Sequence, residues 1–223
     1  MIGILVLACS AVFVCVLVLA APAVRDLALS DKANKASETS REITSGNTMG
    51  DPQAPIHLIE YGDYQCPYCL QFWRETEPFL IEEYVNTGKV YFEYRSLGEF
   101  LGPESGWAAE GAYCAGDQGK FWEFHDTLFT NWTGENAGDF TPEKLIRYAG
   151  TLDLDMDVFK ACLEDGKHKG TVERDRLQAE AEGITATPTF IINGRKVEGA
   201  QSFQIMKHIL DELLNGDIQT IHG

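Results

Sequence analysis

The chain has 223 residues, and 44% of them are hydrophobic, which is enough for one mid-sized domain with a sizeable core. Its 34 acidic residues outnumber its 18 basic residues, so the formal net charge is −16. This negative surplus argues against binding to nucleic acid or to anionic membrane surfaces as a main role. Function must therefore be sought in particular residues.

The N-terminal segment is strongly apolar, since Ile2 to Val24 includes no charged residue. At about 1.5 Å per residue, a helix over 1–24 would cross a hydrocarbon core of about 30 Å. The segment is predicted to be an uncleaved transmembrane anchor or a signal peptide, with Ala21-Pro22-Ala23 as the candidate cleavage site. A buried core helix is the third alternative. Either of the first two would export the rest of the chain, to the periplasm or the outer cell face.

A polar stretch over 25–50 is rich in Ser, Thr, Asn, Lys and Glu and shows no apolar periodicity. It is predicted to be a flexible tether. The main domain is expected over 51–216, and a short tail over 217–223.

The first predicted elements of this domain are a strand, a helix and a second strand. Ile56 to Tyr61 is a short, mostly apolar strand, and Val90 to Tyr94 is the second strand. Between them, Cys66 to about Thr87 has helical character, with an interruption at Pro78 and a stop at Gly88.

A helical block follows over about 103–183, with breaks predicted at 116–119, 131–139 and 150–155. Thr141-Pro142 is typical of a helix start, in which a hydroxyl cap precedes a proline in the first turn.

The strand pattern returns in the C-terminal part of the chain. Asn193-Gly194 separates the runs Thr189 to Ile192 and Arg195 to Val197, and this dipeptide favours a tight hairpin turn. Apolar residues then recur at helical spacing from Phe203 to Leu214 and predict a last helix with one apolar face.

The main chemical motif is Cys66-Pro67-Tyr68-Cys69, directly after the first strand and at the start of the first helix. Two cysteines three residues apart share one helix face, so they can form a disulfide or open to a dithiol. Cys66 would lie near the positive end of the helix dipole, which favours its thiolate, while Cys69 would be the more buried, resolving thiol. A CxxC also forms half of many zinc sites, so the motif alone leaves both interpretations open.

Three stretches together resemble the DsbA-like thiol:disulfide oxidoreductases, from about Asp51 to Leu214. They are Glu60 to Cys69, Gly119 to His125 and Gly183 to Phe190. The resemblance implies an α/β fold: a thioredoxin fold with a helical domain inserted between the second strand and the C-terminal hairpin.

The same resemblance assigns roles to individual residues. Thr187-Pro188 would be a cis peptide that faces Cys66 and pairs with an extended substrate segment. Glu60 would be a buried acid that exchanges protons with Cys69, although a strand-end surface position is the alternative. Tyr68 stands where the most oxidising relatives carry histidine. Because tyrosine supplies no positive charge, we expect a less extreme oxidant.

Cys114 and Cys162 fall in the helical block. In an exported protein such a pair most simply forms a structural disulfide, as in some members of this family. Two free thiols, a second redox relay, or a Cys₄ zinc site that includes Cys66 and Cys69 are the alternatives.

The sequence thus predicts a membrane-tethered, extracytoplasmic enzyme that exchanges disulfides with exported cysteine-containing proteins, most readily as an oxidant. A membrane quinone-linked thiol oxidase, DsbB-like or VKOR-like, is the implied partner for reoxidation. We expect a monomer with no cofactor and no metal. An isomerase or reductase of the same fold, or a peptide-binding chaperone module, remains the alternative.

Overall fold

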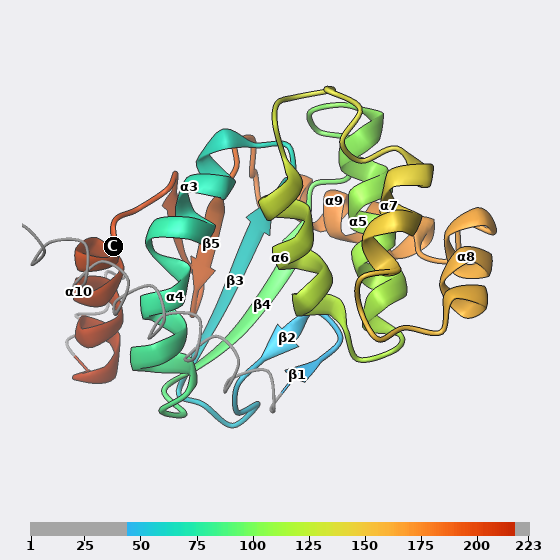
Figure 1. The fold of residues 1–223 in the computed structure, drawn as a ribbon. Helices are drawn as coiled ribbons and strands as arrows, with labels where there is room; N and C mark the ends of the chain where they lie inside the picture. The colour runs from blue at the N-terminus through green and yellow to red at the C-terminus, as the bar shows by residue number, and fades with distance from the viewer. Residues whose placement is uncertain (1–43, 217–223) are drawn as a thin grey trace, which may run out of the picture.

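A computed structural model describes residues 44–216 (Figure 1). The predicted anchor or signal segment, most of the predicted tether and the predicted tail lie outside these residues. Within them, no helix has the length and apolar character needed to cross a membrane.

The domain is built around a six-stranded mixed sheet in the order β1-β2-β4-β3-β5-β6. The strands are β1 (Thr44–Ser45), β2 (Thr48–Met49), β3 (Ile56–Gly62), β4 (Val90–Ser96), β5 (Thr189–Ile192) and β6 (Arg195–Glu198). Strand β3 runs parallel to β4 and antiparallel to β5. It is therefore a central strand, and its C-terminal end leads into the cysteine motif.

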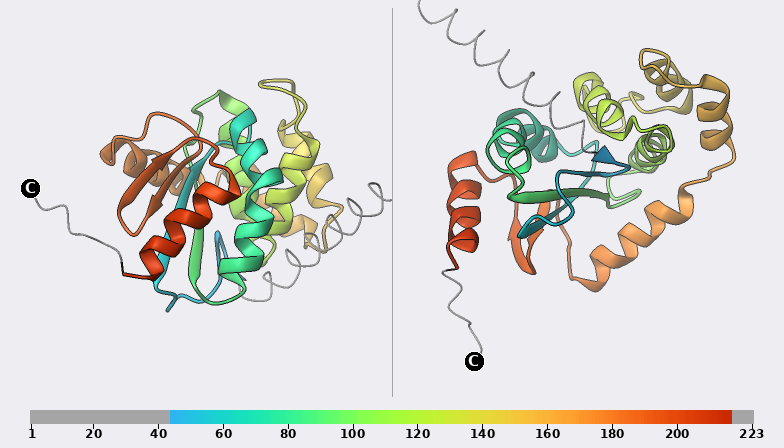
Figure 2. Two further views of the ribbon diagram at one scale, coloured as in Figure 1. Left: turned by 90° about the vertical axis from the view of Figure 1, so that its left-hand side faces the viewer. Right: turned by 90° about the horizontal axis from the view of Figure 1, so that it is seen from below.

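Helices cover both faces of this sheet (Figures 1 and 2). They are α3 (Pro67–Glu75), α4 (Glu77–Leu80), the π-helical turn η2 (Ile81–Val85), α5 (Pro103–Gly116), α6 (Phe121–Asn131), α7 (Pro142–Ala149), α8 (Met156–Glu164), α9 (Lys169–Ala181) and α10 (Phe203–Leu214). Helices α3, α4 and α6 lie over one face, α10 packs against α4, and α9 lies over the opposite face (Figure 2). Helices α5, α7 and α8 form a block beside the sheet, and α6 connects this block to the sheet (Figure 1).

The two faces of β3 belong to two different cores. Side chains alternate along a strand, so Ile56, Leu58 and Glu60 share one face while Ile59 and Tyr61 share the other. Ile56 and Leu58 belong to the larger core with α3 and α6, whereas Ile59 and Tyr61 pack in a smaller core against α9. Glu60 consequently points toward the helix that carries the cysteines.

Most of the predicted elements are confirmed. The chain turns between β5 and β6 at Asn193 and Gly194, whose φ angles are 50° and 86°, as a tight turn of this type requires. Helix α3 ends before Pro78, which lies in the first turn of α4, where its missing N–H is not needed. Helix α7 begins at Pro142, but the Thr141 side chain makes no capping hydrogen bond. The expected hydroxyl cap is therefore wrong.

The predicted tether is wrong over its last residues. Residues 44–49 form β1 and β2, and β2 pairs with β4 through Met49 and Phe92. Met49 is buried in the larger core. Two-residue strands are too short to produce an alternating pattern, so the polar composition of this stretch concealed them.

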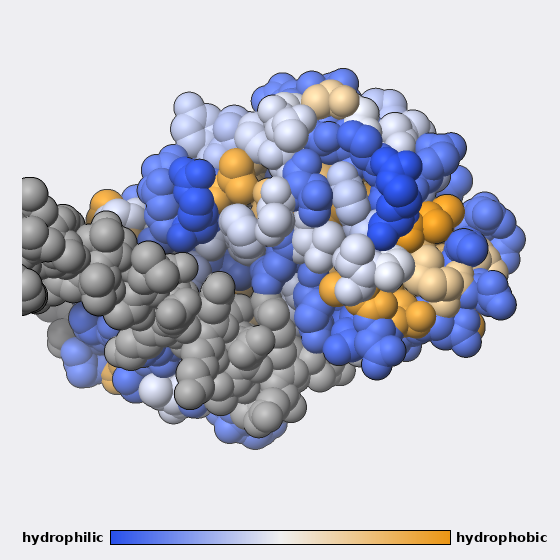
Figure 3. Space-filling view, viewed as in Figure 1, coloured by the Kyte–Doolittle hydropathy of each residue, from blue (hydrophilic) through white to orange (hydrophobic). Residues whose placement is uncertain are grey.

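The face seen in Figure 3 is mostly hydrophilic, in keeping with the net charge of −16. Apolar residues gather on the side that carries α7 and α8. Val158 on α8 is half-exposed.

Candidate functional site

The cysteine motif begins helix α3 at the C-terminal end of β3. Cys66 is the N-cap residue, Pro67 follows in the first turn, and Cys69 lies one turn further along. A tight turn holds this arrangement, because the Cys66 N–H donates to the Asp63 carbonyl at 3.0 Å and the Gln65 N–H donates to Asp63 Oδ1 at 2.7 Å. Both cysteines are free thiols in this structure.

The turn also depends on Gly62 at the end of β3. A Cβ at this position would lie 2.6 Å from the Tyr94 ring, a separation that real Cβ atoms do not show. Glycine is therefore required where the strand passes Tyr94 and enters the motif.

Cys66 is poised to be a thiolate at neutral pH. A hydrogen bond with the Cys69 side chain lowers the pKa of Cys66 to about 6, and the Thr187 side chain and the backbone N–H groups of Cys69 and Tyr68 act in the same direction. Burial opposes these effects without cancelling them. The position at a helix N-terminus supplies the free N–H groups.

Cys69 has the opposite environment. It is completely buried, and burial raises its pKa well above the ordinary value, with the Cys66 thiolate as a further cause. The Asp63 N–H contacts its Sγ at 3.5 Å. The pair thus combines one sulfur that loses its proton easily with one sulfur that holds its proton.

The two residues between the cysteines face solvent. Pro67 is exposed, and Tyr68 is 62% exposed. The Tyr68 side chain is therefore available for contact with a docked protein.

The Thr187–Pro188 peptide bond is cis, and both residues are buried beside Cys66. In its protonated form, the Cys66 thiol donates to the Thr187 carbonyl at 3.3 Å. The structure therefore brings together the cysteine motif and Thr187-Pro188, which are 121 residues apart.

Glu60 is buried on the same face of β3 as the larger core. Burial raises its pKa well above the ordinary value, and the charges of Glu77 and Cys66 raise it further. Its Oε2 has no hydrogen-bond partner among the described residues. The alternative of a surface residue at the strand end is wrong, because β3 is a central strand.

Several residues near the site were not singled out from the sequence. Asp63 accepts hydrogen bonds from Gln65, Ser105 and Leu101, yet burial raises its pKa to about 6. The Tyr64 hydroxyl lies 3.1 Å from His125 Nδ1.

Glu77 completes this set, since its Oε2 lies 3.7 Å from His125 Nε2. One signal could have identified it and His125: both polar side chains occupy positions on the apolar faces of their helices.

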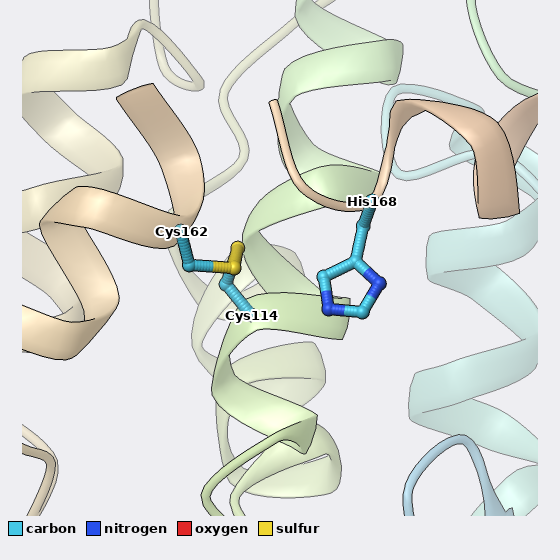
Figure 4. Close-up of side chains that lie close together, drawn as sticks. All are labelled: Cys114, Cys162 and His168. Carbon is cyan, nitrogen blue, oxygen red and sulfur yellow. A yellow bond between two sulfur atoms is a disulfide. The ribbon is translucent and has the colours of Figure 1, made fainter. Parts of the chain in front are cut away.

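Cys114 and Cys162 form a disulfide that joins α5 to α8, with His168 beside it (Figure 4). Because each sulfur is bonded to the other, the alternatives of two free thiols and of a Cys₄ zinc site do not hold in this structure. The Nε2 atom of the neighbouring His168 lies 2.8 Å from the carboxylate of Asp117. The bond is remote in sequence from Cys66 and crosslinks the helical block.

Comparison with known proteins identifies the family. A family model described as Thioredoxin matches residues 43–212. Disulfide bond formation protein D of Bacillus subtilis is 27% identical over 190 residues, which cover 84% of this chain and 85% of that protein. The Na(+)/H(+) antiporter NhaA 3 of Salinispora tropica is 35% identical over 161 residues, which cover 72% of this chain and 23% of the antiporter. The chain thus spans about a quarter of the length of that relative.

Solved structures have the same fold. BdbD from Bacillus subtilis in its oxidised form superposes with a TM-score of 0.71 at 26% identity, covering 77% of this chain and 94% of BdbD. Wolbachia pipientis α-DsbA1 gives a TM-score of 0.66 at 29% identity, covering 80% of this chain and 98% of that protein. These matches confirm the resemblance drawn from the motifs, and the chain belongs to the thioredoxin family.

Proposed function

We propose that this protein is an extracytoplasmic thiol:disulfide oxidoreductase that exchanges disulfides with exported proteins through Cys66 and Cys69. The observation that carries the proposal is the contrast within the motif: the pKa of Cys66 is lowered to about 6, whereas the pKa of the buried Cys69 is raised. The names of the Bacillus relative and of the Wolbachia structure point to the same chemistry.

The exchange begins with the oxidised pair. A substrate thiolate attacks Cys66 Sγ, the Cys66–Cys69 bond breaks, and the electron pair leaves with Cys69 Sγ, which takes up a proton. The second substrate thiolate then attacks the substrate sulfur of the mixed disulfide and releases Cys66 as a thiolate. The substrate leaves with a disulfide, and the enzyme is left as a dithiol.

Each nearby residue has a role in this scheme. Glu60 supplies the proton for Cys69 across the buried interior. Thr187 lies just before β5, and its N–H makes no backbone hydrogen bond within residues 44–216. An extended substrate segment could pair with it as an added strand. Tyr68 and Pro67 form the exposed docking edge beside Cys66.

The direction of exchange follows from the stability of the thiolate. A sulfur with a low pKa is a good leaving group, which favours donation of the disulfide to substrates. Tyr68 supplies no positive charge, so we assign a milder oxidant than relatives with histidine at this position. An isomerase or reductase would use the same residues. Reoxidation would require a membrane thiol oxidase, to which an N-terminal anchor would keep the domain close.

The Cys114–Cys162 disulfide supports the proposed compartment, because structural disulfides persist outside the reducing cytosol. It also gives the domain a crosslink that does not take part in the exchange.

The mechanism is tested by trapping. Cys69→Ala should accumulate mixed disulfides with exported proteins through Cys66, and these adducts should be released by reductant. The double variant Cys66→Ala with Cys69→Ala is the matched control and should trap nothing. If Cys69→Ala also traps nothing while remaining folded, the exchange mechanism is wrong. If the double variant still assists refolding of a cysteine-free substrate, the chaperone alternative gains support.

The direction is tested by equilibration of the Cys66–Cys69 pair with glutathione. A reduction potential well above about −270 mV favours an oxidant or isomerase, and a value near it favours a reductase.

A further inference from the structure

A group of buried polar side chains lies on the Cys69 side of the sheet, and the reaction described above uses one of them, Glu60. The others are Tyr64 in the loop after β3, Glu77 on α4 and His125 on α6. All four residues are more than nine-tenths buried. A polar group buried this deeply costs stability unless it is paired, so its presence under a redox motif calls for an explanation.

The contacts within the group run from Tyr64 to Glu77. The Tyr64 hydroxyl is 3.1 Å from His125 Nδ1, and His125 Nε2 is 3.7 Å from Glu77 Oε2. The second separation is an ion-pair distance rather than a hydrogen bond, and both of its atoms lack a hydrogen-bond partner among the described residues. Hydrogen bonding alone therefore does not account for the pair, whereas opposite charges at this separation would attract strongly in a buried site.

Aromatic rings enclose His125. Its ring centroid lies 4.9 Å from that of Tyr94, 5.0 Å from Phe129 and 5.1 Å from Trp122. Such an enclosure keeps water away, so a positive charge on His125 would need a counter-charge inside the site. A proton on His125 would thus be balanced by the carboxylate of Glu77.

Two carboxylates that share a buried site do not both ionise easily, so one of them tends to hold a proton. Glu77 lies within ion-pair distance of His125, which would be a cationic partner when protonated, whereas Glu60 Oε2 has no hydrogen-bond partner in the described part of the chain. With a proton on His125, the negative charge would belong on Glu77 and the proton on Glu60. The two carboxylates act on each other electrostatically, since the pKa of Glu60 is raised first by burial and next by the charge of Glu77.

We propose that Glu77 and His125 are positioning residues for the exchange: His125 holds the negative charge on Glu77, and that charge keeps on Glu60 the proton that Cys69 takes up when the active-site disulfide opens. The proposal rests on the function proposed above. The step is balanced, because the Cys66–Cys69 bond breaks, Cys69 Sγ leaves with the electron pair, and the Glu60 proton passes to it. On reoxidation Cys69 returns the proton to Glu60.

The other titratable groups around Glu60 and Glu77 come from each packed element. Cys66 and Cys69 face them from α3, Tyr94 from β4, Asp63 and Tyr64 from the loop after β3, and Asp126 from α6 beside His125. Asp126 accepts a hydrogen bond from the Trp73 indole at 2.9 Å.

The test follows the Glu60 carboxyl by NMR in protein labelled with ¹³C at the glutamate carboxyl carbons. The active site is kept oxidised so that neither cysteine titrates, and the signal is assigned from its loss in Glu60→Gln. In Glu77→Gln the loss of the neighbouring charge should lower the Glu60 titration midpoint by about one pH unit or more. Glu110→Gln, a matched change at a buried carboxyl on α5, should leave the midpoint unmoved.

His125 is tested in the same way. His125→Gln keeps an N–H donor but cannot carry a charge, so Glu77 would lose the partner that keeps it anionic. In this background Glu77→Gln should move the Glu60 midpoint by less than half as much as in the parent protein. Equal shifts in the two backgrounds would show that His125 has no part in setting the charge of Glu60.

A Glu60 midpoint that does not move in folded Glu77→Gln overturns the proposal. Glu77→Met is a second uncharged variant, and it must move the midpoint in the same direction. The titration needs no enzymatic turnover, so it stays readable even if Cys69→Ala traps no substrate and the proposed function fails.

A bound cation is the competing explanation, since Glu77, His125 and Asp126 place potential ligand atoms within 4.8 Å of one another. The protein is therefore titrated after dialysis against a chelator. Two results together would overturn the role of His125. The Glu60 midpoint would move when Zn²⁺ is added to the parent protein, and it would not move in Glu77→Gln without Zn²⁺. A bound metal ion, rather than His125, would then balance the charge of Glu77.

Discussion

Cys66 and Cys69 are three positions apart and both lie in the larger core, but they differ in the properties that govern ionisation. Cys66 is the N-cap residue and accepts hydrogen bonds from N–H groups of the first turn, whereas Cys69 is completely buried. The different roles of the two cysteines therefore follow from their positions on the helix. The N-cap position stabilises the Cys66 thiolate, and the position one turn later places the Cys69 sulfur in the interior.

This contrast predicts selective alkylation of the reduced protein by iodoacetamide. The rate at Cys66 should rise with pH around a midpoint near 6, where its pKa lies, while Cys69 stays unreactive. Thr187→Val removes a side-chain hydrogen bond to Cys66 and should shift the midpoint upward. Mass spectrometry of the modified peptides reports both sites, and a midpoint that stays near 8.5, the value of an ordinary thiol, would contradict the assignment.

Glu60 makes stability depend on pH in a definite direction. Its pKa is raised in the folded state, mainly by burial, so between the unfolded and folded values the native protein binds one more proton than the unfolded chain. Stability therefore falls as pH rises through this window, by up to about 1.4 kcal/mol per pH unit. In the oxidised protein, Glu60→Gln should gain stability relative to the parent from pH 5 to 8. Exposed Glu143→Gln is the control, and parallel thermal melts of Glu60→Gln and parent across this range would refute the prediction.

At the level of elements, the crosslink between α5 and α8 holds the helical block together. It closes a loop with a sequence separation of 48, for which the chain-entropy model gives about 4 kcal/mol of stabilisation. The double variant Cys114→Ala with Cys162→Ala should therefore lose about 2–4 kcal/mol in denaturant unfolding. The alkylation midpoint of Cys66 should stay the same, since the bond does not contact the motif. If the double variant unfolds at the same denaturant concentration as the parent, the Cys114–Cys162 bond does not act as a stabilising crosslink.

The elements that were predicted correctly carry strong local signals. The hairpin follows from Asn193-Gly194 between two β-rich runs, and α10 follows from apolar residues at helical spacing over Phe203–Leu214. Strands β1 and β2 carry no such signal, because two residues show no period of their own; β1 pairs with β2, and β2 pairs with β4. Their existence depends on a distant strand rather than on local preference.

The same distinction applies to the site. Cys66 and Cys69 were predictable because their spacing is itself the signal, and Thr187-Pro188 was reached through the family resemblance. The contact of Glu77 with His125 joins α4 to α6, so no local pattern could have predicted it. The sequence does show that Glu77 lies on an apolar helix face. This position indicates a buried charged group but does not identify the residue that it contacts.

For the whole molecule, the motif couples redox state to fold stability. In the reduced form the folded pKa of Cys66 is about 6, below the value near 8.5 expected for an unfolded thiol. A depressed pKa adds stability that is fully present above the unfolded value and is lost as pH falls through the folded value. The oxidised form has no thiol at this position and gains nothing from the change in pH.

The difference in melting temperature between the reduced and oxidised forms should therefore shift in favour of the reduced form from pH 5 to about 8. Above that range the raised pKa of Cys69 works against it, since unfolding would then release the Cys69 proton. The measurement uses the Cys114→Ala, Cys162→Ala background, so that reductant opens one disulfide. If the two forms melt in parallel across pH, the folded state does not stabilise the Cys66 thiolate. The lowered pKa of Cys66 would then contribute nothing to the potential of this disulfide, and the oxidant role would lose this physical basis.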